Sequence, residues 1–147
     1  MMRLLHSRYE HGAAAALVAV VRVVAGIFFV SVSTGKLTDH ASEAVDFHRY
    51  GVPIPDVSVY AVGGIELVCG MLLVVGLLTR PAAAALALTL LGAIATAGRV
   101  EGGSFNLGVA PALLIAMLFL LWAGGGRPAL DAVLERRWTG PGADRAA

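Results

Sequence analysis

Four long apolar stretches constrain the fold of this chain more than any other feature of its sequence. They cover about residues 13–35, 57–78, 82–98 and 107–122, and each approaches the roughly 20 residues that an α-helix needs to cross the bilayer core. Hydrophobic residues make up 58% of the chain and charged residues 14%, whereas soluble domains are usually about 45–50% apolar. The sequence therefore predicts an all-α integral membrane protein, a four-helix bundle in contact with the lipid bilayer.

Polar segments flank the apolar stretches and divide the chain into three parts. We expect an N-terminal segment over 1–12, a membrane domain over 13–123, and a tail over 124–147 that begins with three glycines. The tail contains an amphipathic piece from 129 to 138, which is typical of a helix lying on the membrane surface.

Two connections carry signals of their own. The connection over 36–56 predicts a short interfacial helix with Ala41, Val45 and either Phe47 or His48 on its apolar side, ended by Gly51 and the prolines after it. Thr79-Arg80-Pro81 predicts a tight turn, so the second and third stretches should form an antiparallel helical hairpin.

The distribution of cations predicts the orientation of the chain, because short cytoplasmic loops are enriched in Lys and Arg. With both termini on one side, that side carries seven cations and the opposite side three. We therefore expect both termini to be cytoplasmic. The seven are Arg3, Arg8, Arg80, Arg127, Arg136, Arg137 and Arg145, and the three are Lys36, Arg49 and Arg99.

Composition and spacing exclude several classes of function. The net charge is +1, which leaves no basic surface for nucleic acid. Cys69 is the only cysteine, so the chain can form neither an internal disulfide nor a redox dithiol. His40 and His48 are eight residues apart, which is not a recognised metal-ligand spacing, and we expect no metal site.

Two charges lie inside the apolar stretches, Arg22 in the first and Glu66 in the second. A charge near the bilayer centre costs about 2.5–3.5 kcal/mol even on the lenient insertion scale. Counting at about 1.5 Å per residue from Lys36 and from Asp56 places both charges at similar depth. The sequence thus predicts a buried Arg22–Glu66 ion pair.

Helical spacing places small and polar residues on the same faces as these charges. Small residues allow membrane helices to approach closely and bury a charge between them. The first stretch aligns Arg22, Gly26, Phe29, Ser33 and Lys36; the second aligns Gly63, Glu66 and Gly70; the third aligns Ala85, Thr89, Gly92, Thr96 and Arg99.

This polar centre has three readings from the residues alone. The ion pair can simply fix helix register. Alternatively, Arg22 or Lys36 can donate hydrogen bonds to the carbonyls of a small polar or quinone-like molecule whose ring packs on Phe29. The third reading is a docking face for the helix of a partner protein.

Four motifs together resemble the DoxX family of small bacterial membrane proteins. They are RVVAGIFFVSVSTGKL at 22–37, YGVPIP at 50–55, GGIELVCGMLLVVGLLTRPAA at 63–83 and GGGRPALDAVL at 124–134. The family's charged positions are matched by Arg22, Lys36, Glu66, the Thr79-Arg80 pair at the hairpin, and Asp131 in the tail. The sequence departs from the family's pattern at 127–129, which concerns the role of the tail.

The resemblance implies a four-helix, multi-pass protein of the bacterial plasma membrane, linked to membrane oxidoreductase systems and oxidative-stress defence. Members resemble quinone-reducing oxidoreductase subunits, and distant relatives serve as membrane assembly factors. We therefore expect a subunit or accessory of a redox assembly that works with partner proteins. It would be at most a non-catalytic or quinone-binding subunit, with quinone the one cofactor implied. The alternative is a non-enzymatic chaperone or scaffold for a partner membrane protein.

Overall fold

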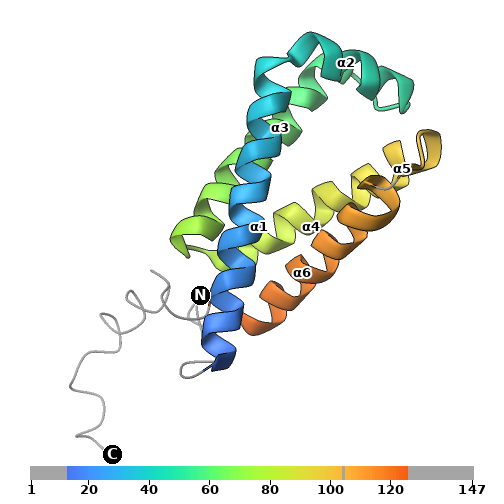
Figure 1. Cartoon of the computed structure of the whole chain (residues 1–147). Helices are drawn as coiled ribbons and strands as arrows, with labels where there is room; N and C mark the ends of the chain where they lie inside the picture. The colour runs from blue at the N-terminus through green and yellow to red at the C-terminus, as the bar shows by residue number, and fades with distance from the viewer. Residues whose placement is uncertain (1–12, 104, 126–147) are drawn as a thin grey trace, which may run out of the picture.

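The computed structural model describes residues 13–103 and 105–125, and in this part of the chain every regular element is a helix (Figure 1). The predicted segment 1–12 and the amphipathic piece of the tail lie outside the described residues. In chain order the elements are α1 (Ala13–Thr38), α2 (His40–Arg49), α3 (Pro55–Val75), α4 (Thr79–Ala95), α5 (Ala97–Val100), the π-helical turn η2 (Phe105–Val109) and α6 (Ala110–Ala123).

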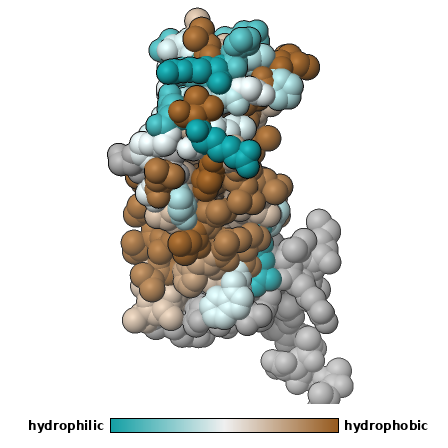
Figure 2. Space-filling model, turned by 90° about the vertical axis from the view of Figure 1, so that its right-hand side faces the viewer, coloured by the Kyte–Doolittle hydropathy of each residue, from teal (hydrophilic) through white to brown (hydrophobic). Residues whose placement is uncertain are grey.

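Three helical segments are long and apolar enough to cross a membrane: Ala13–Thr38, Pro55–Val75 and Thr79–Val100. A fourth apolar segment, Leu107–Ala123, is shorter. Figure 2 shows a broad hydrophobic band across the middle of one face of the molecule, with hydrophilic side chains gathered at the end that carries α2. The predicted all-α membrane fold is confirmed.

The helices form two arms (Figure 1). Helix α1 packs along α3 in the first arm, and α4 packs along α6 in the second. The arms meet where α3 turns into α4 and diverge toward the end that carries α2 and α5 (Figure 1). The closed end holds the apolar core, in which Val18, Leu73, Leu86, Met117 and Leu120 are buried.

The first arm depends on a close contact between two glycines. A Cβ atom added to Gly26 would lie 2.8 Å from the carbonyl oxygen of Gly70, and one added to Gly70 would lie 3.0 Å from the carbonyl oxygen of Gly26. Real Cβ atoms essentially never come closer than 3.0 Å to another atom, and the contact at Gly26 lies below that limit, so glycine is required there for this helix spacing. The predicted small-residue faces of α1 and α3 therefore do pack together.

The turn between α3 and α4 lies three residues earlier than the sequence suggested. Gly76 takes a left-handed conformation with φ of 78°, and the amide of Leu77 donates a 3.0 Å hydrogen bond to the carbonyl of Leu72. This is a glycine-based helix end. Thr79 and Arg80 form the first turn of α4 instead of the turn itself. As predicted, α3 and α4 are joined by a tight turn and run in opposite directions, but they diverge into separate arms (Figure 1), and the prediction that Thr79-Arg80-Pro81 makes the turn was wrong.

Candidate functional site

A cavity of about 800 Å³ lies between the two arms, on the side of α2 and α5. Its wall is mostly apolar and draws residues from all six α-helices. Phe28 and Phe29 line it from α1, Phe47 from α2, and Leu88 and Leu113 from the second arm. The volume falls within the roughly 300–1,000 Å³ of ordinary small-molecule sites.

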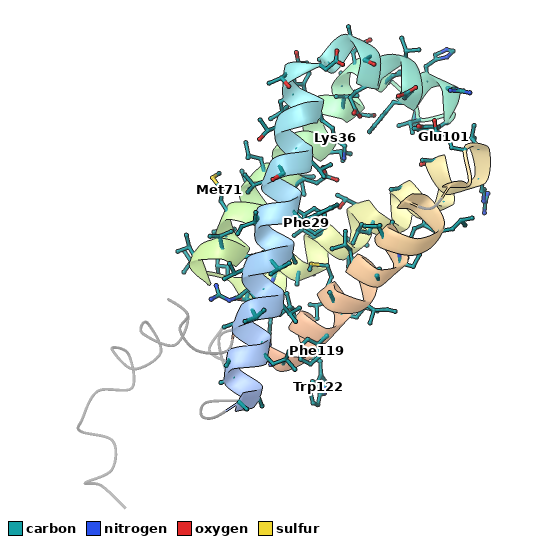
Figure 3. All side chains as sticks on the ribbon, viewed as in Figure 1. Phe29, Lys36, Met71, Glu101, Phe119 and Trp122 are labelled. Carbon is teal, nitrogen blue, oxygen red and sulfur yellow. The ribbon has the colours of Figure 1, made fainter. Side chains whose placement is uncertain are left out.

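A buried ion pair marks the wall that the first arm contributes. The Nζ atom of Lys36 lies 2.6 Å from Oε2 of Glu66, and both residues line the cavity. Gly63, one helical turn before Glu66, leaves room for the end of α1, since a Cβ there would lie 3.2 Å from a methyl carbon of Leu37. In Figure 3, Phe29 and Lys36 extend from α1 toward the space between the arms.

The predicted Arg22–Glu66 pair is wrong, because Glu66 pairs with Lys36. The depth estimate from the sequence placed Lys36 at the same depth in the membrane as Asp56, whereas the structure places Lys36 beside Gly63. The seven residues from 56 to 63 correspond to about 10 Å along a helix. That axial shift carries Arg22 past Glu66 to the last turn of α3.

Arg22 instead binds the carboxyl-terminal end of α3. Its Nη1 donates to the carbonyl oxygens of Leu73 and Val74, at 2.5 and 3.2 Å, and only 2% of the residue is exposed. The last carbonyl groups of a helix have no hydrogen-bond partner within the helix, and a cation at this position binds them. The cation also interacts favourably with the negative end of the helix dipole. Arg22 therefore holds the closed end of the first arm together.

The five predicted site residues separate into two groups. Phe29, Lys36 and Glu66 line the cavity, whereas Arg22 and Ser33 do not. Ser33 is fully buried and donates a 3.0 Å hydrogen bond to the carbonyl of Val30 in its own helix.

The predicted polar face of α4 lines the second wall. Ala85, Thr89, Gly92 and Thr96 all border the cavity, and Arg99 does not. The hydroxyls of Thr89 and Thr96 donate to carbonyls one turn earlier in the helix, so each oxygen can still accept a hydrogen bond from a molecule in the cavity.

Helix α2 contributes cavity residues that sequence reasoning missed. Glu43, Phe47 and Tyr50 follow one another at helical spacing and line the cavity, whereas Val45 is 68% exposed. The expected apolar face of α2 is thus divided, because Phe47 lines the cavity whereas Ala41 and Val45 are exposed. The spacing of Glu43, Phe47 and Tyr50 is the signal that could have identified the correct face.

Glu101, which follows α5, joins the second arm to α2. Its carboxylate lies 3.8 Å from Nη1 of Arg49. Figure 3 places Glu101 between the ends of α2 and α5. Burial is the main cause that raises the pKa of Tyr50 to about 12, and the nearby Glu101 carboxylate acts in the same direction.

Glu43 lies near the Lys36–Glu66 pair. Lys36, Glu43, Glu66 and Glu101 all line the cavity, and we call the part that they line its polar end. Burial raises the pKa of the Glu43 carboxyl above its ordinary value, and the nearby Lys36 ammonium opposes that shift. Within residues 13–103 and 105–125, no three His, Cys, Asp or Glu side chains come together in a way that would hold a metal ion. The polar end is thus suited to hydrogen bonding and charge selection.

Thr79 and Arg80 lie far from the cavity, at the closed end. Thr79 is fully buried, and Nη2 of Arg80 donates to the carbonyl of Trp122 at 3.3 Å. This contact joins the start of α4 to the end of α6, so the two residues help to hold the second arm.

Comparison with known proteins gives a family and a relative. The DoxX family model matches residues 17–99, which include most of α1 and all of α2, α3 and α4. The membrane protein Rv3486 of Mycobacterium tuberculosis is 33% identical over 151 aligned residues, which cover 92% of each chain. No solved structure matches the chain.

Proposed function

The chain belongs to the DoxX family of membrane proteins, and from this premise we propose that it is a subunit or accessory of a membrane redox assembly that binds a quinone-like amphiphile. The observation that carries the proposal is the cavity of about 800 Å³ between the arms. Catalysis would belong to a partner protein, and this chain would hold the amphiphile.

The walls of the cavity suit the two ends of such a molecule. Phe28 and Phe47 offer aromatic faces on which a ring can stack, whereas Phe29 also lines the cavity but is only 2% exposed. The Lys36 ammonium has three N–H donors and uses one on Glu66, so it can also donate to a ring carbonyl. An apolar tail would meet the aliphatic side chains of α4 and α6.

The alternative, a non-enzymatic chaperone or scaffold, calls for a dry interior and an exposed face of small residues. The cavity between the arms is inconsistent with a dry interior. Gly26 and Gly70 are packed against each other inside the first arm, so they are not available to a partner helix. The ligand-binding function is therefore the better supported of the two.

The proposal also places the protein in the bacterial plasma membrane with both termini in the cytoplasm. Helix α1 begins and α6 ends at the same end of the molecule (Figure 1). Seven cations fall on that side of the chain and three on the other, which favours this orientation. Helix α2 and Glu101 would then face outward.

A cavity-filling variant tests the ligand. Ala93 lines the cavity, whereas Ala95 on the same helix is exposed and does not, so Ala93→Phe and Ala95→Phe form a matched pair. After gentle purification, lipids and quinones retained by each variant are extracted and identified by mass spectrometry. We expect Ala93→Phe to lose a quinone that the parent and Ala95→Phe retain. Equal retention in both variants, or no quinone in the parent, would contradict the proposal.

A further inference from the structure

The charged residues that line the cavity are predominantly acidic. Glu43, Glu66 and Glu101 provide carboxyl groups, and Lys36 is the one cation among the lining residues that the structure describes. Lys36 is committed to Glu66 at 2.6 Å, so the pair is neutral as a unit. Two further carboxyl groups, those of Glu43 and Glu101, then remain at the polar end.

The nearest cation outside the lining does not reverse this balance. Arg49 reaches Glu101 at 3.8 Å, but its side chain is 64% exposed. Exposed pairs of this kind contribute little because water screens them. An anionic head group placed between Glu43 and Glu101 would lie next to two carboxylates. No cation in the lining is free to offset this repulsion, and juxtaposed like charges strongly disfavour binding.

An uncharged head avoids this repulsion and can still form hydrogen bonds. The remaining N–H groups of Lys36 can donate to a carbonyl, and the hydroxyl oxygens of Thr89 and Thr96 on the opposite wall can accept from an N–H or O–H group. The polar end therefore offers hydrogen-bond partners to a neutral, carbonyl-bearing head group. It offers no uncommitted positive charge to a carboxylate or a phosphate.

We infer that the cavity selects amphiphiles with an uncharged, carbonyl-bearing head over anionic lipids, and that Glu43 and Glu101 are the residues that set this preference. This inference rests on the proposed function, because it assumes that the cavity binds an amphiphile. It adds the head-group class that is accepted and the class that is rejected. Such selection would keep the cavity open to a scarce neutral ligand in a membrane rich in anionic phospholipids.

Oleamide and oleate provide a direct test, because they share one hydrocarbon tail and differ in the charge of the head. Each competes with decylubiquinone for purified full-length protein in detergent at neutral pH, and the bound molecules are quantified by mass spectrometry. We expect oleamide to displace decylubiquinone at concentrations at least about tenfold lower than oleate. Equal potency of the two, or greater potency of oleate, would overturn the inference.

The assignment to Glu43 and Glu101 is tested with the double variant Glu43→Gln and Glu101→Gln. It should bring the oleate and oleamide potencies to within about twofold of each other, mainly by improving oleate. Asp56→Asn is the matched control, because Asp56 is an exposed carboxylate near α2 that does not line the cavity. A double variant that keeps the parental ratio, or a control that loses it, would refute the assignment.

The proposed function and the head-group selection are contradicted by different results. If decylubiquinone does not bind the parent, or binds Ala93→Phe equally well, the proposed function fails and the inference fails with it. If decylubiquinone binds in the cavity but oleate and oleamide compete equally, only the head-group selection fails. Retention of decylubiquinone by the double variant confirms that the variant is folded.

Discussion

The ammonium of Lys36 lies 2.6 Å from a carboxylate oxygen of Glu66, and the two side chains are only 16% and 8% exposed. The pair joins the end of α1 to the middle of α3 and faces the cavity. It explains how a carboxylate can occupy an apolar helix, because each charge neutralises the other where water is scarce.

Removing either partner of this pair should destabilise the protein strongly. Glu66→Leu or Lys36→Met leaves an uncompensated buried charge, which typically costs about 3–5 kcal/mol. The double variant should recover much of the loss, because no lone charge remains. Thermal unfolding of the four proteins in one detergent measures the coupling, with Arg49→Met as an exposed control. Additive single effects would show that the pair does not couple.

Arg22 should be energetically independent of Glu66. Arg22→Leu removes the hydrogen bonds to the Leu73 and Val74 carbonyls, and hydrogen bonds to charged groups are worth about 1.5–3 kcal/mol each. The same double-mutant analysis with Glu66→Leu should give additivity within about 0.5 kcal/mol. A large coupling energy between Arg22 and Glu66 would support the pairing that the sequence suggested and contradict the structure.

Two glycines of α1 should respond to alanine with opposite signs. Gly26→Ala would force a Cβ to within 2.8 Å of the Gly70 carbonyl, so α1 and α3 must separate and stability should fall. Gly35→Ala meets nothing within 4 Å, and alanine in a helix is favoured over glycine by about 0.8–1 kcal/mol. Thermal unfolding in detergent compares the two variants with the parent. A stabilising Gly26→Ala would exclude the close helix crossing.

Tyr50 should ionise late in an alkaline titration. The sequence has three tyrosines, and the pKa of Tyr50 is raised from 10.0 to about 12. Absorbance at 295 nm should therefore show a delayed step that Tyr50→Phe removes and Tyr60→Phe retains. Glu101→Gln should move the step to lower pH, because it removes the carboxylate that raises this pKa.

The same shift has a defined sign for stability. The folded state holds the Tyr50 proton more tightly than the unfolded state does, so its contribution is fully present below pH 10 and is lost as the pH rises through about 12. The parent should therefore lose stability relative to Tyr50→Phe between pH 9 and pH 12. A gain in stability relative to Tyr50→Phe over that range would contradict the assignment.

The proposed orientation can be tested by thiol labelling in whole cells. In a Cys69→Ala background, Val45→Cys on the exposed side of α2 should react with a membrane-impermeant maleimide added outside. Ser7→Cys, in the predicted cytoplasmic segment, should react only after the cells are permeabilised. The reverse pattern would place both termini outside the cell.

Features that depend on local spacing could be predicted from the sequence. The periodicity of Gly26, Phe29 and Ser33 identified the buried face of α1. The cavity face of α4 was identified by four residues at helical spacing, Ala85, Thr89, Gly92 and Thr96. These predictions succeed because neighbours three or four residues apart share a helix face regardless of the rest of the fold.

The pairing of Lys36 with Glu66 could not be predicted, because it depends on the axial register between α1 and α3. That register follows from the Gly26–Gly70 contact and from α1 continuing to Thr38 before α2 begins. Both are properties of packing between distant segments. The face of α2 that lines the cavity could not be predicted either, because near a membrane the apolar side of a helix can face lipid, so apolarity alone does not identify the side that packs.

The unequal lengths of the apolar helices have a consequence for the surrounding bilayer. Helix α1 has 26 residues and is about 39 Å long, whereas Leu107–Ala123 spans about 26 Å. The hydrocarbon layer is about 30 Å thick, so α1 can fit by tilting or by extending its polar end beyond the layer, and the lipids beside α6 can thin to meet its ends. The protein would thus impose an uneven membrane thickness around its circumference and favour shorter acyl chains next to the second arm.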